Sequence, residues 1–167
     1  MMPEQTILVK MAEISVVENT PDSAYKLKTT LGSCVGVILS DGKRGVHGLA
    51  HILLPERLGG DRVIGKYADT AIPALLEKME EKGCRKKDLS AFLVGGACMF
   101  EAFDGNGLTN IGDKNVMAAT RILQQLRIPV VFQETGGKSG RTITFDGNAG
   151  KVFVKTLSKI ETRGEKN

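Results

Sequence analysis

The chain has 167 residues and a formal net charge of +4, from 23 basic and 19 acidic residues. Its hydrophobic fraction of 41% and charged fraction of 25% are typical of one globular domain, and its apolar runs are too short for membrane insertion. The basic excess is small, interspersed and free of interleaved aromatic residues, so nucleic-acid binding is not expected. Three cysteines, with no C-x-x-C pair and no secretory leader, predict reduced thiols and a cytoplasmic location.

The first half of the chain predicts short strands joined by turns. The expected strands cover residues 6–17 (as one strand or two), 25–31, 35–39 and 46–54. Turn residues separate the strands at 18–23 and at 40–43, and the second of these turns predicts a hairpin. Gly32 and Ser33 interrupt the pattern between the second and third segments.

The second half predicts two helices and four more strands. Apolar residues recur at helical spacing over 70–82, where Thr70 is the expected N-cap, Pro73 falls in the first turn and Gly83 follows the last turn. The same spacing predicts a second helix over 113–126. The other expected elements are strands at 89–94, 129–132, 141–145 and 151–157 and loops at 101–112 and 135–140.

These elements indicate a single-domain α/β protein of the α+β kind, a mixed β-sheet sandwich with two long helices. Strands outnumber helices and several are joined by hairpins, which favours a sandwich. The domain is expected to cover residues 1–157, and the polar residues 158–167 are expected to form a C-terminal tail.

Cys34 is the first candidate for chemistry. It stands directly after Gly32 and Ser33, where one strand is expected to end and the next to begin. Gly32 lets a substrate carbonyl approach the backbone, and N–H groups near Ser33 are natural donors to an oxyanion. The alternative is that Cys34 is a small buried hydrophobic residue, which is the commoner role of a cytosolic cysteine.

His51 is the expected partner of Cys34, because it lies in the next apolar segment and a thiol needs a base to become a nucleophile. An imidazolium at this position would lower the pKa of the thiol. The hydroxyl that orients the ring would come from Thr29, Thr30 or Ser33. The alternative for His51 is a hydrogen-bonded histidine of the core.

A metal site is not expected. His47 and His51 are four residues apart, but the glycines and β-branched residues around them indicate a strand, in which the two would lie about 13 Å apart. Residues 104–107 lack the later ligands of a calcium loop and are expected to form a turn. Since no phosphate-binding loop is present, no cofactor is expected, and Cys84 and Cys98 are expected to be structural.

Six short motifs stand in order along most of the chain. They are Leu-Gly-Ser-Cys-Val at 31–35, Ala-His-x-x-Leu-Pro at 50–55, Gly-Lys-Tyr-Ala-Asp-Thr-Ala at 65–71, Gly-Gly-Ala-x-Met-Phe at 95–100, Asn-Ile-Gly-x-x-Asn at 110–115 and Glu-Thr-Gly-Gly at 134–137. In these motifs the chain resembles the chemoreceptor glutamine deamidase family (CheD). That family in turn resembles toxin deamidases with a Cys–His site, which supports the sandwich fold by analogy.

The resemblance implies a cysteine hydrolase that converts glutamine side chains on the cytoplasmic helical bundle of chemoreceptors to glutamate, in chemotaxis adaptation. The family's nucleophile maps onto Cys34 and its base onto His51. Its third residue is a threonine six or five residues before the cysteine. Those positions hold Lys28 and Thr29 here, so Thr29 is assigned and Thr30 is its rival.

The implied reaction proceeds through a thioester on Cys34, and Gly32, Ser33 and Thr30 are the expected substrate-binding residues. One alternative is another amidohydrolase or thioesterase that uses the same pair. A second alternative is a binding module, because the resemblance also implies a CheC-type phosphatase as a partner. The roles of His47 and Lys28 stay open.

Overall fold

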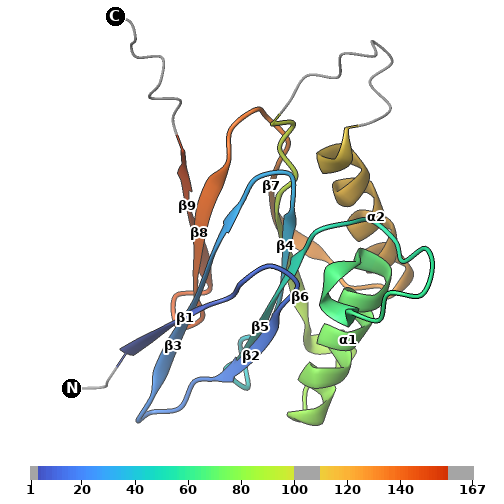
Figure 1. Ribbon diagram of the computed structural model, residues 1–167. Helices are drawn as coiled ribbons and strands as arrows, with labels where there is room; N and C mark the ends of the chain where they lie inside the picture. The colour runs from blue at the N-terminus through green and yellow to red at the C-terminus, as the bar shows by residue number, and fades with distance from the viewer. Residues whose placement is uncertain (1–3, 100–109, 158–167) are drawn as a thin grey trace, which may run out of the picture.

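The computed structural model describes residues 4–99 and 110–157, which fold into three layers (Figure 1). A four-stranded sheet forms one outer layer, a five-stranded sheet forms the middle layer, and two α-helices form the other outer layer. The predicted mixed α/β sandwich with two helices is therefore confirmed. The predicted tail at 158–167 lies outside the described residues.

Both sheets are mixed. In spatial order the first sheet consists of β1 (Glu4–Leu8), β3 (Ala24–Leu31), β8 (Arg141–Asp146) and β9 (Lys151–Thr156). The second consists of β2 (Ile14–Glu18), β5 (Val46–Ile52), β4 (Val35–Asp41), β6 (Ser90–Gly95) and β7 (Val130–Thr135). The pairs β1–β3 and β6–β7 are parallel, and the remaining pairs in these sheets are antiparallel.

Helices α1 (Ala68–Glu81) and α2 (Ile111–Gln125) cover the face of the second sheet that points away from the first sheet (Figure 1). Two short 3₁₀ helices, η1 (Ile64–Lys66) and η2 (Lys86–Asp88), lie before and after α1 in the chain. The side of α1 that faces the sheet is apolar at helical spacing. Its buried residues are Ala68, Ala71, Ile72, Leu75, Leu76 and Met79.

Two hydrophobic clusters hold the layers together, one between the sheets and one between the second sheet and the helices. Strands β4 and β5 are buried along their whole length because they contribute to both clusters. Successive side chains of a strand point to opposite faces. On β5, Leu49 packs between the sheets, which places His47 and His51 on that same face.

The predicted segment 6–17 forms two strands, one in each sheet. β1 ends at Leu8, and residues 9–13 cross to the second sheet before β2 begins at Ile14. In this crossing Ala12 takes a positive φ of 68°, and its N–H donates to the carbonyl of His51 (2.9 Å). The crossing therefore runs beside the end of β5.

Helix α1 begins two residues earlier than predicted. Tyr67 is extended and bridges to Leu54, and the helix starts directly after it, so Thr70 is not the N-cap. The Thr70 hydroxyl donates instead to backbone carbonyls, including that of Tyr67 (3.3 Å). Pro73 accordingly lies inside the helix and not in its first turn. At the other end Gly83 follows the helix with a φ of 94°, as predicted.

Helix α2 also begins two residues earlier than predicted. The side chain of Asn110 accepts from the N–H of Asp113 (3.2 Å) and forms the N-cap, so that Ile111 is the first helical residue. The loop predicted at 101–112 is therefore shorter at its end. Residues 101–109, including the turn predicted at 104–107, lie outside the described residues.

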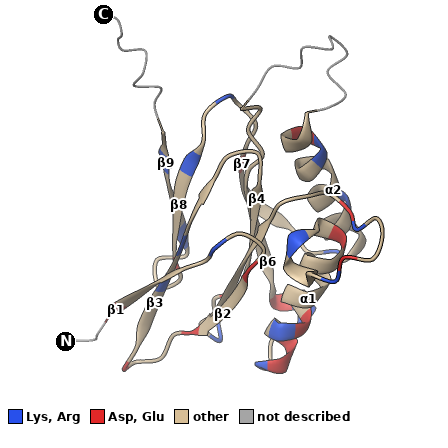
Figure 2. Ribbon diagram, in the orientation of Figure 1, with Lys and Arg blue, Asp and Glu red and all other residues tan. Residues whose placement is uncertain are grey.

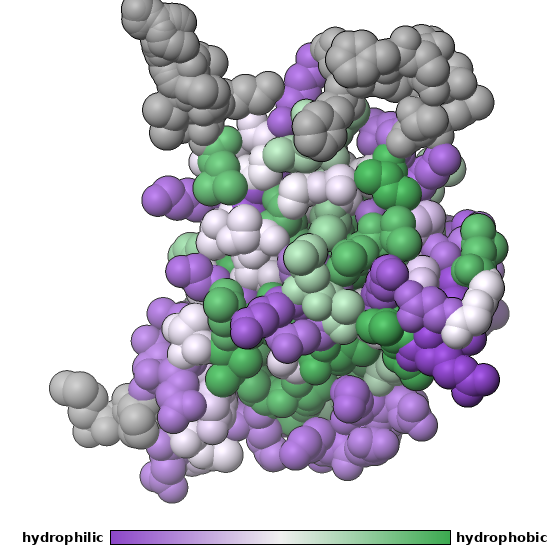
Figure 3. Space-filling model, viewed as in Figure 1, coloured by the Kyte–Doolittle hydropathy of each residue, from purple (hydrophilic) through white to green (hydrophobic). Residues whose placement is uncertain are grey.

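Charged and hydrophobic residues are unevenly distributed over the surface. The charged residues of α1, coloured along its ribbon in Figure 2, are Asp69, Glu77, Lys78, Glu80 and Glu81, and all five are exposed. On the face shown in Figure 3, hydrophobic side chains gather along the middle of the molecule and hydrophilic ones along its lower edge. No helix within residues 4–99 and 110–157 has both the length and the apolar character that a membrane span requires.

Candidate active site

Cys34 lies in the connection from β3 to β4. β3 ends at Leu31 in the first sheet, Gly32 and Ser33 cross to the second sheet, and β4 begins at Val35. Cys34 is half-buried, and its side chain packs against the cluster between the sheets. The connection from β3 to β4 lies at one end of the sandwich, where the chain passes from one layer to the other (Figure 1).

His51 lies on the neighbouring strand and faces the same side. In the register of β4 and β5 it stands opposite Gly36, two residues beyond Cys34. Cys34 directly precedes the first residue of β4 and packs against the cluster between the sheets, on the face to which His51 also points. His51 is 3% exposed, and its Nε2 has no hydrogen-bond partner among the described residues.

Thr29 holds the other ring nitrogen of His51. Its side chain points inward from β3, is 1% exposed, and places Oγ1 2.7 Å from His51 Nδ1. The same hydroxyl donates to the carbonyl of Val9 (2.5 Å), in the crossing between β1 and β2. Since the single hydroxyl hydrogen goes to Val9, Thr29 accepts from the ring, which assigns the ring proton to Nδ1. Nε2 then carries the lone pair that can accept a thiol proton.

Thr30 and Lys28 point to the opposite face of β3. Both are exposed, and the Thr30 hydroxyl lies 3.0 Å from that of Thr142 on β8. Side chains alternate along the strand, so one position separates the inward Thr29 from the outward Thr30. The structure therefore brings Thr29 against His51 and leaves Thr30 on the outer surface of the first sheet.

Burial favours the neutral form of both candidate groups, the Cys34 thiol and the His51 imidazole. Burial raises the pKa of the Cys34 thiol, against a smaller lowering effect of its own backbone N–H. Burial lowers the pKa of His51, against smaller upward effects of the Val9 carbonyl and the Glu13 carboxylate. The sequence predicted an imidazolium that lowers the pKa of Cys34, but desolvation disfavours both charges. A neutral imidazole is the form that can accept the thiol proton as attack begins.

Backbone hydrogen bonds fix the segment that carries Cys34. The carbonyl of Gly32 accepts from Ala97 N–H (2.9 Å), and the carbonyl of Cys34 accepts from Gly96 N–H (2.8 Å). Gly95, with a φ of 106°, permits this close approach, because a Cβ there would lie 2.4 Å from the Cys34 carbonyl oxygen. At Gly32 itself a Cβ would make only an ordinary contact, at 3.5 Å, so packing does not require glycine there.

Asn115 reaches the same segment from α2. Its side chain is fully buried, and its Nδ2 donates to the carbonyls of Ser33 (3.0 Å) and Leu53 (2.9 Å). Ser33 directly precedes Cys34, and Leu53 follows His51 by two residues. One amide group therefore joins the two segments that carry the candidate nucleophile and base. In the sequence Asn115 is the last residue of the motif at 110–115, and the motif pattern alone indicates no role for it.

A buried arginine supports the loop at 136–140. Arg141, the first residue of β8, is 5% exposed and donates to the carbonyls of Glu134 (2.6 Å) and Gly136. The N–H of Gly136 in turn donates to the carbonyl of Gly95 (2.9 Å). The loop therefore lies against the glycines that hold Cys34, and the sequence analysis did not single out Arg141.

His47 lies at the other end of the same face of β5. Its Nδ1 is 2.8 Å from Ser40 Oγ, and its ring packs against Phe145 with the centroids 5.3 Å apart. Within residues 4–99 and 110–157, no group of three or more His, Cys, Asp or Glu side chains is placed to hold a metal ion. Each histidine has a hydroxyl group at its Nδ1 instead.

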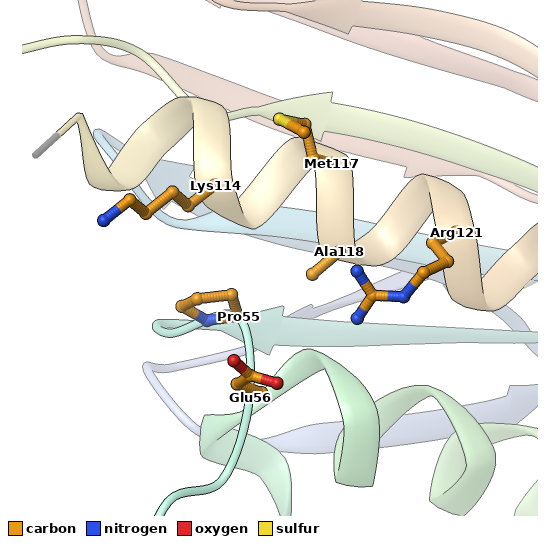
Figure 4. A pocket seen from close by; sticks show the side chains of 6 residues that line it. All are labelled: Pro55, Glu56, Lys114, Met117, Ala118 and Arg121. Atoms are coloured by element: carbon orange, nitrogen blue, oxygen red, sulfur yellow. The ribbon is translucent and has the colours of Figure 1, made fainter. Parts of the chain in front are cut away.

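A surface groove lies between α2 and the chain that follows β5 (Figure 4). Pro55 and Glu56 form one wall, and Lys114 and Arg121 flank Ala118 on the other. The adjacent Met117 is 69% exposed. The groove thus combines apolar, basic and acidic side chains, and Pro55 and Glu56 come from the chain that follows His51.

Comparison with known proteins decides the family. The family described as CheD chemotactic sensory transduction matches residues 53–156. The probable chemoreceptor glutamine deamidase CheD of Clostridium botulinum strain Hall is 41% identical over 158 residues, which cover 93% of this chain and 96% of the relative. The chain belongs to the CheD family. The chemoreceptor glutamine deamidase CheD of Bacillus licheniformis is also 41% identical, over 92% of this chain and 91% of its own length.

The CheD motifs of this chain meet at the end of the sandwich that holds Cys34. Hydrogen bonds join the motif at 31–35 to those at 95–100 and 110–115, and join 95–100 to 134–137. The chain that follows His51 pairs with the motif at 65–71, since Leu53 and Leu54 both donate to the carbonyl of Lys66. Segments far apart in the CheD sequence therefore build one local structure.

Among solved structures, that of Neisseria meningitidis protein NMB0706, of the family DUF152, is distantly similar. It is 12% identical over 81% of this chain and 64% of its own length, with a TM-score of 0.47.

Proposed function

We propose that this CheD-family chain hydrolyses glutamine side-chain amides of chemoreceptors to glutamate, with Cys34 as nucleophile and His51 as general base. The arrangement of His51 carries the proposal. Thr29 holds Nδ1 at 2.7 Å, while the buried Nε2 has no partner in the described chain and lies on the face that Cys34 shares. The relatives from two genera are named for the same reaction.

The first half of the proposed reaction forms a thioester. The Cys34 sulfur attacks the side-chain carbonyl carbon of glutamine, and its proton passes to His51 Nε2. The carbonyl oxygen becomes an oxyanion, for which the backbone N–H of Cys34 is the proposed donor. When the tetrahedral intermediate collapses, the C–N bond breaks and His51 returns the proton to the departing ammonia.

The second half releases glutamate. His51 Nε2 takes a proton from water, whose oxygen attacks the thioester carbon and forms a second oxyanion. The C–S bond then breaks, and His51 returns the proton to the Cys34 sulfur. The balance is one glutamine side chain and one water consumed, and one glutamate side chain and one ammonia formed. Thr29 keeps the ring oriented through both halves by accepting from Nδ1–H.

The product gains a negative charge on the receptor surface. In a helical bundle, a new carboxylate changes the repulsion and attraction between residues three and four apart on a helix. The proposed substrate is the cytoplasmic helical bundle of a chemoreceptor, so the proposed place of action is the cytoplasm. The proposed second partner, a CheC-type phosphatase, would need a surface of this chain and not its thiol.

Mass spectrometry of a receptor cytoplasmic fragment tests the proposal. The fragment is incubated with wild type, Cys34→Ala or the matched control Cys84→Ala, which removes a buried thiol from the cluster between sheet and helices. We expect glutamine-to-glutamate conversion, with one ammonia per site, from wild type and Cys84→Ala and none from Cys34→Ala. A folded Cys34→Ala that converts glutamine would remove Cys34 as nucleophile.

A folded wild type that converts no receptor glutamine would overturn the proposed reaction. In that case, capture of a CheC-type phosphatase by both wild type and Cys34→Ala would favour the binding module over the enzyme.

A further inference from the structure

We infer that Asn115 is a positioning residue for the chemistry at Cys34: it orients the Ser33–Cys34 peptide unit so that the Cys34 N–H is directed at the oxyanion. The inference rests on the proposed function, which supplies the glutamine side chain as the natural substrate. The contacts of one fully buried amide carry it.

The side chain of Asn115 connects three distant parts of the chain. From α2 it donates to Ser33, 82 residues away in sequence, and to Leu53, 62 residues away. A primary amide nitrogen has two hydrogens, so each carbonyl receives one of them. The Oδ1 of the same amide is buried and has no hydrogen-bond partner among the described residues.

Because the peptide bond is planar, the hydrogen bond to the Ser33 carbonyl also fixes the direction of the Cys34 N–H. The described chain has no cis peptide, so the carbonyl of Ser33 and the N–H of Cys34 point in opposite directions from one peptide plane. Asn115 draws the carbonyl toward α2. The N–H of Cys34 is therefore directed away from α2. The helices cover one face of the second sheet, and the Cys34 side chain lies on the other face.

The neighbouring peptide units are fixed by different donors. The carbonyls of Gly32 and Cys34 accept from backbone N–H groups of Ala97 and Gly96. The carbonyl of Ser33 has a side chain as its partner. Within this segment, Asn115 is thus the element that a substitution can remove without altering the backbone donors.

The second contact of Asn115 holds the chain that follows His51 close to the segment that carries Cys34. Leu53 is two residues beyond His51, so the shared amide ties the end of β5 to the segment of the nucleophile. Loss of the amide would release both carbonyls together. We therefore expect the effect to fall on steps that build negative charge on a carbonyl oxygen.

The test compares two reagents that react at the same thiol. p-Nitrophenyl acetate acylates a thiol through an oxyanion, whereas iodoacetamide alkylates it by displacement at a saturated carbon and forms no oxyanion. Both rates are measured at Cys34 by peptide mapping, alongside deamidation of the receptor fragment. The variants are Asn115→Ala and Asn115→Asp, the second of which keeps the size of the side chain. The matched control is Asn110→Ala, which removes the N-cap of the same helix.

We expect both Asn115 variants to lose about tenfold or more in ester acylation and in kcat for deamidation, with alkylation changed by less than about threefold. Asn110→Ala lowers thermal stability and leaves the ratio of acylation to alkylation at the wild-type value. Circular dichroism identifies a variant that does not fold, and Asn115→Asp then carries the comparison.

An unchanged ratio in a folded Asn115 variant would overturn the inference, and so would an equal loss of acylation and alkylation. Neither small reagent requires a receptor. A changed ratio in a protein that deamidates no receptor would therefore support the role of Asn115 while removing the proposed substrate.

Discussion

His47 and His51 occupy opposite ends of one face of β5, and each has a hydroxyl group at its Nδ1. Around His47 the structure closes: Phe145 packs on the ring, and a Cβ on Gly147 would lie 2.4 Å from Nε2. Around His51 no protein group takes Nε2 in the described chain, and Cys34 shares the face. A hydroxyl-held buried histidine is thus packed against Phe145 and Gly147 at one end and lies on the same face as Cys34 at the other, so its neighbours distinguish the candidate base.

The largest expected difference in activity is between variants that remove the two imidazoles. His51→Gln removes the proposed base and is expected to lower kcat/KM for deamidation by about a hundredfold or more. His47→Gln is expected to lower the stability by about 1 kcal/mol and to change kcat/KM little. Steady-state ammonia release and urea unfolding of both variants measure the contrast. Equal losses of activity would erase the distinction between the two ends.

The two hydroxyl groups give the next contrast. Thr29→Val keeps the shape of the side chain but leaves the Val9 carbonyl and the His51 Nδ1–H without their hydroxyl partner, so kcat is expected to fall about tenfold or more. Thr29→Ser keeps the hydroxyl and should retain most of the wild-type kcat. Ser40→Ala is expected to affect unfolding alone. If Thr29→Val kept the wild-type kcat and pH profile, Thr29 would not orient the ring.

Acidification should weaken the fold at both ends. Burial lowers the pKa of His47 and His51 in the folded protein, whereas the unfolded chain titrates near the ordinary value of 6.5. The unfolded state therefore binds more protons below pH 6.5, and stability present above that pH is lost as the pH falls through the folded pKa values. Urea midpoints should decrease below pH 6.5, with a smaller slope in His47→Gln. A slope that no histidine variant reduces would point to other groups.

The smallest expected effect is at Thr30. Its hydroxyl pairs with Thr142 on the exposed face of the first sheet, so Thr30→Ala is expected to cost about 0.5 kcal/mol or less of stability. Deamidation should proceed at the wild-type rate. A large loss of kcat in this variant, with a wild-type melting temperature, would restore Thr30 as a residue of the site.

The sequence predicted most of the strands and both helices, because apolar periodicity records which faces are buried. The start of α1 was wrong for a physical reason: Thr70 looked like an N-cap, but the bridge between Tyr67 and Leu54 places the first turn earlier. The inward position of Thr29 was already readable from Leu27 and Leu31, which lie two residues away on either side and share its face.

The contacts of Asn115 were not readable from the sequence. They depend on how α2 crosses the ends of β4 and β5, and its partners are 82 and 62 residues away. The same holds for the carbonyl of Val9, which reaches Thr29 only because the chain changes sheets at residues 9–13. Local patterns fix elements, whereas these hydrogen bonds depend on the packing of layers.

Burial of Cys34 also bears on how the protein survives oxidative stress. Peroxides oxidise the thiolate and not the thiol, and a raised pKa keeps the resting side chain in its protonated form. In the proposed mechanism, deprotonation is coupled to the arrival of a carbonyl, since His51 would accept the proton as the C–S bond forms. A cysteine that becomes reactive only with its substrate in place should resist conversion to sulfenic acid while it waits.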